Sequence, residues 1–161
     1  MAWTNSKIFR PYLSDVLNNT TAMDAGSDTF YCTLWDTDIT PASDVTAANS
    51  AYGSGVWTTS GVAGAQEWYE SGQWAQGGVA MATTSLTEGA GYVMFDASVD
   101  TASGTAADLT AVVGAMVYDF SLATPVDNQG VCYNYFGGAN TVTNGTFTVV
   151  WNANGVYRIT L

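Results

Sequence analysis

The chain has 161 residues, of which 13% are aromatic and only 11% are charged, and its formal net charge is −11. The aromatic content, together with frequent Thr, Ser, Asn and Gly, favours a sandwich or barrel and excludes a disordered chain. The only cations are Lys7, Arg10 and Arg158, so the chain lacks the basic stripe that nucleic acids and anionic membranes require.

One apolar stripe at helical spacing lies within residues 5–19. It consists of Ile8, Phe9, Tyr12, Leu13, Val16 and Leu17, which recur at a period near 3.6. Asn5 or Ser6 is a candidate N-cap. Pro11 fits the first turn of a helix that starts near Arg10, or it marks a kink.

Short apolar runs between turn residues predict strands in the rest of the chain. We expect strands at 29–35, 79–87, 91–98, 111–120 and 131–136, and one near 56–59 inside the irregular, glycine-rich segment 41–78. Gly114 interrupts the apolar run at 111–120, which indicates a bulge or a close approach of another group to the backbone.

The last 16 residues give the clearest local pattern. Phe147, Val149 and Trp151 alternate with their neighbours, and so do Tyr157 and Ile159. The two alternating runs flank a turn that ends in Asn-Gly, which predicts a β-hairpin between 146–151 and 156–161.

These elements predict an all-β fold, a β-sandwich or jelly-roll-like single domain with one short N-terminal helix. Residues 1–161 form one domain in this prediction, with 1–20 as an N-terminal arm and helix and 28–161 as the β-sandwich. No internal repeat or change of composition divides the chain.

Cys32 and Cys132 are the only cysteines, and each lies in an apolar, strand-like run. We expect two buried, reduced thiols. A disulfide would require neighbouring strands with Cα atoms within about 7 Å and an oxidising compartment.

The residue types leave little room for catalysis. The chain has no histidine, which removes the most frequent general base and metal ligand. Glu67 and Glu70 flank two aromatic residues and are the candidate carboxylate pair for glycoside hydrolysis. Solvated loop acids over packed aromatic residues are the favoured interpretation. We therefore expect no enzyme, no catalytic residue and no cofactor.

An acidic cluster follows the first predicted strand. Asp36, Asp38 and Asp44 are suitable oxygen ligands for Ca²⁺, but the glycine and closing glutamate of a calcium loop are missing. Asx turns after a strand are the favoured interpretation, so no metal site is predicted.

Two longer segments resemble a group of small virion proteins of tailed bacteriophages. The segments are 111–119 and 135–149, and Gly77-Gly78 before a strand and the run 30–35 are similar as well. The resemblance covers most of the chain. This chain departs from the pattern of that group at Val113, where the group often has a basic residue, and near Gly137-Gly138, where the usual lysine is absent.

The resemblance implies a non-enzymatic capsid decoration (cement) protein that binds the major capsid protein on the outer surface of the virion. It also implies assembly in the host cytoplasm, and a homotrimer is favoured because decoration proteins often occupy lattice three-folds. A minor tail or tail-fibre-associated protein is the first alternative. A carbohydrate-binding module is the second, and it would expose Trp57, Trp68 and Trp74 on one flat face.

We expect the capsid interface to include the apolar N-terminal residues and the three cations, because buried aromatics and arginine are frequent interface hot spots. The expected interface residues are Trp3, Lys7, Ile8, Phe9, Arg10 and Arg158. The competing interpretation is that Ile8 and Phe9 cover the base of the sandwich.

Overall fold

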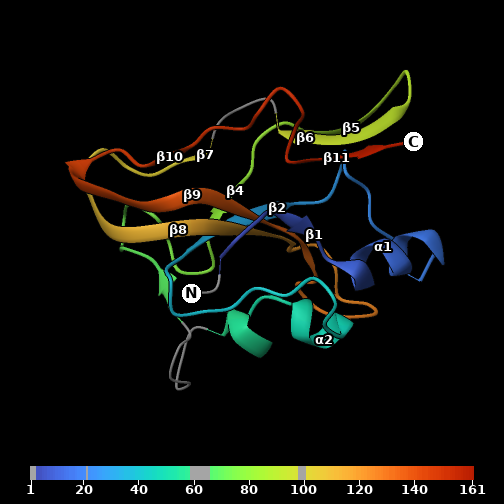
Figure 1. Ribbon diagram of the computed structural model, residues 1–161, viewed down its shortest axis with the longest axis horizontal. Coiled ribbons are helices and arrows are strands. Elements are labelled where there is room, and N and C mark those ends of the chain that lie inside the picture. Colours follow the sequence, from blue (N-terminus) through green and yellow to red (C-terminus); the bar gives the residue numbers. More distant parts are fainter. Residues whose placement is uncertain (1–2, 21, 59–65, 98–100) are drawn as a thin grey trace.

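The computed structural model describes residues 3–20, 22–58, 66–97 and 101–161 and confirms an all-β, sandwich-like domain (Figure 1). The strands are β1 (Lys7–Ile8), β2 (Phe30–Trp35), β3 (Glu67–Trp68), β4 (Val79–Ala80), β5 (Thr84–Gly89), β6 (Tyr92–Ala97), β7 (Thr101–Ala102), β8 (Ala107–Asp119), β9 (Gly130–Gly145), β10 (Thr148–Val149) and β11 (Tyr157–Thr160). The helical segments are α1 (Arg10–Leu17), α2 (Ala47–Ser50) and the 3₁₀ turn η1 (Gly55–Trp57).

The strands form one large and two small sheets. The large sheet has the order β1-β9-β8-β2-β3, with β4 also paired to β2. The small sheets are β10-β7 and β11-β6-β5. In Figure 1 the small sheets lie on one side of the large sheet and α2 lies on the other, so the large sheet is covered on both faces.

The core on one side lies between the large sheet and β11-β6-β5. Phe30 of β2 packs on Phe95 of β6 with ring centroids 4.7 Å apart, and Phe95 packs on Tyr157 of β11 at 5.5 Å. Phe30 and Phe95 are fully buried. Burying such aromatic side chains is the main source of stability in a sandwich of this size.

The core on the other side is a cluster of aromatic rings. Trp57 of η1 lies at its centre, fully buried, and its ring contacts those of Trp3, Phe9, Trp35 and Tyr133 at centroid distances of 5.9, 5.8, 5.2 and 6.0 Å. The segment 41–57 therefore closes this face with an indole ring instead of a second sheet.

Helix α1 begins at Arg10, as the proline predicted. Pro11 lies in the first turn, and Phe9 is the N-cap residue, without a side-chain capping bond. The expected cap at Asn5 or Ser6 is wrong, because the chain before the helix pairs with β9 as strand β1. A two-residue strand is too short to leave a periodic pattern in the sequence.

The predicted C-terminal hairpin is also wrong. Its turn exists, since Asn152 and Gly155 form an isolated antiparallel bridge and Gly155 has a φ of +75°. However, β10 pairs with β7, whereas β11 pairs with β6. The turn therefore joins two sheets. Val156 donates its N–H to the carbonyl of Phe95 in β6, which places β11 beside β6.

The strand expected near 56–59 is replaced, over its described residues, by η1 and the residue that follows it. Two glycines with positive φ, Gly53 at +84° and Gly55 at +57°, turn the chain before Trp57. This backbone conformation is available to glycine at little cost and prevents an extended run.

Gly114 is a close-approach position, as the sequence predicted. A Cβ atom there would collide with the Trp3 ring and would lie 2.7 Å from the Asn134 carbonyl oxygen.

We expect Gly114→Ala to lower the free energy of unfolding by about 1–3 kcal/mol, because neither neighbour has space to move. Urea unfolding measures this loss. Gly138→Ala is the control, since nothing lies within 4 Å of its Cβ position, and an equal loss in both variants would contradict the explanation.

Candidate functional site

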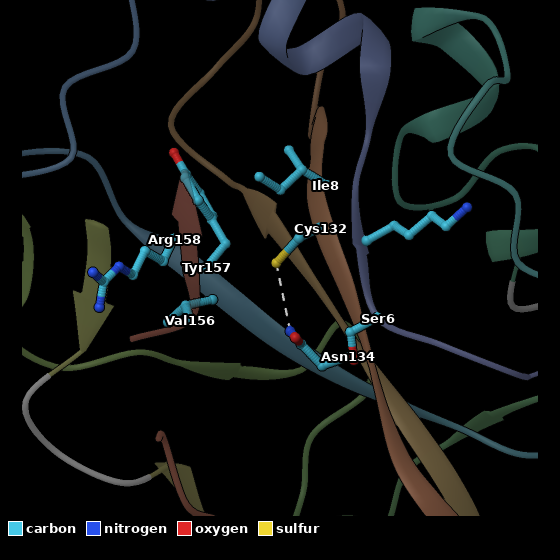
Figure 2. A pocket seen from close by; sticks show the side chains of 8 residues that line it. Ser6, Ile8, Cys132, Asn134, Val156, Tyr157 and Arg158 are labelled. Carbon is cyan, nitrogen blue, oxygen red and sulfur yellow. Dashed lines mark hydrogen bonds between the residues drawn. The ribbon is translucent and has the colours of Figure 1, made fainter. Parts of the chain in front are cut away.

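One pocket joins the N-terminal and C-terminal cations. It has a volume of about 350 Å³ and lies where β1 meets β9 and β11 (Figure 2). Its lining residues are Ser6, Lys7, Ile8, Cys132, Asn134, Val156, Tyr157 and Arg158. Lys7 and Arg158 are 151 positions apart in the sequence and both line this pocket. Lys7 pairs with Tyr133, which packs on Trp57, so the Lys7 side chain points to the face of the large sheet opposite β11.

Strand β1 holds its end of the pocket through β9. Lys7 and Ile8 pair with Tyr133 and Cys132. The hydroxyl of Ser6 accepts a hydrogen bond from the Tyr135 N–H at 2.9 Å, which extends the pairing by one step. The backbone at this edge is therefore fixed, and the Lys7 side chain projects from a rigid strand.

The two cations among the lining residues are both accessible to solvent. Lys7 and Arg158 are exposed. The Arg158 guanidinium carbon lies 3.8 Å from the centre of the Tyr92 ring, and the guanidinium donates to Asn154 Oδ1 at 2.9 Å. Figure 2 shows Arg158 pointing away from Cys132 and Asn134. This arrangement suits contact with a protein surface better than enclosure of a small anion.

The pocket floor is chemically inert. Cys132 is buried, and burial raises the pKa of its thiol to about 12, although Asn134 donates to the sulfur from 3.5 Å. The thiol is therefore protonated at neutral pH and is a poor nucleophile.

The two cysteines are free and buried, as predicted. Cys32 and Cys132 both pair with Val117, from opposite sides of β8. Two strand spacings of about 4.8 Å separate their backbones, which exceeds the reach of a disulfide.

Trp3 and Phe9 do not belong to an exposed interface. Trp3 is 2% exposed and Phe9 is 0% exposed, and both contact Trp57 in the aromatic core. The expectation that they contact a partner is corrected here, because their apolar surface is already used to close the fold. Arg10 is exposed at the start of α1 but does not line the pocket. Of the six predicted interface residues, three line the pocket: Lys7, Ile8 and Arg158.

Five lining residues had not been singled out as site residues from the sequence. They are Asn134, Val156 and Tyr157, together with Ser6, which was considered only as a helix cap, and Cys132, which was considered only as a buried thiol. No signal in the sequence marks them, because their proximity depends on the pairing of β1 with β9 and on the course of β11.

The candidate carboxylate pair has separate structural partners. Glu67 is 8% exposed and accepts hydrogen bonds from the Tyr52 hydroxyl at 2.9 Å and the Gly77 N–H at 2.8 Å. Burial raises the pKa of Glu67 to about 7. Glu70 instead accepts from the Asp108 N–H at 2.7 Å. Each carboxylate therefore ties loops to the large sheet.

The acidic cluster after β2 forms the expected Asx turn. Asp36 Oδ1 accepts a hydrogen bond from the Asp38 N–H at 2.8 Å. Among the described residues, no group of three or more His, Cys, Asp or Glu side chains is placed to hold a metal ion. Within the same part of the chain, no helix is long and apolar enough to span a membrane.

Comparison with known proteins adds no relative: no family model, no curated protein and no solved structure matches the chain.

Proposed function

We propose that this protein is a non-enzymatic virion component that binds the outer surface of a bacteriophage capsid as a decoration protein. The observation that carries the proposal is that Lys7 and Arg158, two of the three cations on a chain of net charge −11, are both exposed and line the same pocket. The resemblance of segments 111–119 and 135–149 to small virion proteins supports the same role.

The charge distribution suits binding to a repeating shell. A strongly acidic protein stays dispersed at high concentration through self-repulsion. The proposed contact surface is the edge formed by Lys7, Ile8, Arg10 and Arg158, which includes all three cations of the chain. Binding through this edge to the major capsid protein, as a homotrimer, is the form of the proposal that we favour.

A minor tail protein is the second candidate, since it would need the same soluble β-domain. The carbohydrate-binding alternative has lost its supporting feature, because Trp57 and Trp74 are fully buried. They cannot form a flat exposed face together with Trp68, which is half-buried.

Cryo-electron microscopy of the assembled particle from the same source tests the location. We expect copies at regular shell positions, in numbers comparable to the capsid subunits, with β1 and β11 at the contact. Density on the tail alone would reject the decoration role in favour of the second candidate. Density on neither would reject a virion role.

The contribution of the two cations is tested by exchanging their charges. We expect the double variant Lys7→Glu with Arg158→Glu to bind isolated capsids at least about tenfold more weakly, because two attractive contacts become repulsive. Co-sedimentation with capsids measures the affinity. The control variant Lys7→Arg with Arg158→Lys keeps both charges and is expected to bind normally. Equal binding by both variants would contradict this contact surface.

A further inference from the structure

An apolar groove lies between α1 and the sheet β11-β6-β5, and it shares Tyr157 with the pocket described above. Its volume is about 450 Å³. Its lining residues are Tyr12, Leu13, Val16, Leu17, Met23, Leu86, Val93, Tyr157, Ile159 and Leu161. In Figure 1, α1 lies beneath the end of β11, so helix and sheet form the two walls.

Several of these side chains are exposed although they are large and apolar. Leu17 is 84% exposed, Leu161 87% and Leu86 51%. Val16 adds to the same patch at 38%. Contiguous exposed apolar surface of this kind marks a contact site more often than scattered single residues do.

Carboxylates border the groove. Glu88 follows Leu86 by two positions on β5 and therefore points to the same side of the sheet, where it pairs with Val93. Asp24 lines an adjoining hollow of about 520 Å³, which shares Val16, Met23 and Leu86 with the groove.

None of the three cations of the chain lines the groove or the adjoining hollow. Arg158 alternates with Tyr157 and Ile159 on β11, so its side chain points to the opposite side of the sheet and lies over Tyr92. The border is therefore acidic, with no compensating basic residue among the lining residues.

We propose that this groove binds an amphipathic helical segment of a partner protein, with leucine-like residues on one face and flanking lysine or arginine. The apolar floor accommodates the apolar face, and Glu88 and Asp24 attract the flanking cations. A second copy of this chain is disfavoured as the occupant, because it carries the same acidic border and the same net charge of −11.

Fluorescence anisotropy with a fluorescein-labelled helical peptide of leucine and lysine tests the proposal on the full chain. We expect saturable binding that weakens as salt increases. A peptide with glutamate in place of lysine, and one with serine in place of leucine, are both expected to bind at least about tenfold more weakly. Equal binding of either control peptide, or no binding of the first, would overturn the proposed chemistry.

Variants locate the binding site. Leu17→Ser and Leu86→Ser remove exposed side chains, so the fold is expected to persist while affinity for the leucine–lysine peptide falls at least about tenfold. Val150→Ser is the matched control, because Val150 is 69% exposed and lines a different hollow. Unchanged affinity in both leucine variants would overturn the location.

Charge and self-association are tested separately. Glu88→Lys is expected to weaken peptide binding about tenfold and to reduce its dependence on salt. Sedimentation velocity compares the self-association of the unmodified protein with that of Leu17→Ser. We expect the same oligomeric state for both. A dimer or trimer that this variant dissociates would assign the groove to a second copy and overturn the partner proposed here.

Discussion

Trp57→Ala is expected to lower the free energy of unfolding by about 3–5 kcal/mol, the usual range for removing a buried aromatic side chain. The ring is fully buried and contacts four other aromatic rings, so its removal leaves a cavity that no neighbouring side chain can fill. For a chain of this length the loss corresponds to a fall of about 6–20 °C in Tm.

Differential scanning calorimetry and urea unfolding measure this effect. Trp57→Phe keeps part of the ring contacts and is expected to lose less stability than the alanine variant. Tyr69→Ala is the surface control, since Tyr69 is 48% exposed, and its change is expected to stay within about 0.5 kcal/mol. Equal losses in Trp57→Ala and Tyr69→Ala would show that the aromatic cluster does not hold this face of the sheet.

This cluster also illustrates what the sequence could not reveal. Four residues from three distant parts of the chain, Trp3, Phe9, Trp35 and Tyr133, meet around the indole of Trp57. From the sequence, Trp3 and Phe9 were predicted to contact a partner protein. Apolar residues near a chain end have the same composition whether they close the protein's own core or contact a partner, so only the tertiary fold decides.

Local patterns predicted local structure well. The start of α1 at Arg10 followed from the fixed φ of Pro11. The run at 30–35 and the apolar run at 111–120 lie in the adjacent strands β2 and β8. Both are central strands that are buried on two faces, which gives continuous apolar runs.

Strand pairing was the part that could not be predicted. Alternation in 156–161 correctly indicated a strand, and Asn-Gly correctly indicated a turn. The partner of that strand depends on the contact of Phe95 with Phe30 and Tyr157, which no local pattern encodes. Lys7, Ile8 and Arg158 were predicted as interface residues, but the pocket that they line depends on the pairing of β1 with β9 and on the course of β11.

Buried carboxyls make the stability of this protein depend on pH, and this is the second large effect that we expect. Burial raises the pKa of Glu67 from its ordinary 4.5 to about 7. Burial and then the negative charge of Asp28 raise the pKa of Asp119 from 3.8 to about 7. The folded protein therefore favours the protonated form of both groups, whereas the unfolded chain ionises them near pH 4.

Between about pH 4 and pH 7 the folded state binds more protons than the unfolded state, so the free energy of unfolding falls as pH rises through this window. Above about pH 7 both states are ionised and this contribution becomes constant. Each pKa unit is worth about 1.4 kcal/mol, so we expect a loss on the order of 2 kcal/mol per carboxyl between pH 5 and pH 8. Urea unfolding at these two pH values measures it.

Neutral variants separate these two groups from the rest of the acidic chain. Glu67→Gln and Asp119→Asn are each expected to remove part of the pH dependence. The free energy of unfolding of each variant, minus that of the unmodified protein, is expected to be larger at pH 8 than at pH 5. Asp38→Asn removes the same charge from an exposed position and is expected to leave the slope nearly unchanged. If the free energy of unfolding changes with pH in Glu67→Gln and Asp119→Asn as it does in Asp38→Asn, the pH dependence comes from overall charge repulsion and not from the buried carboxyls.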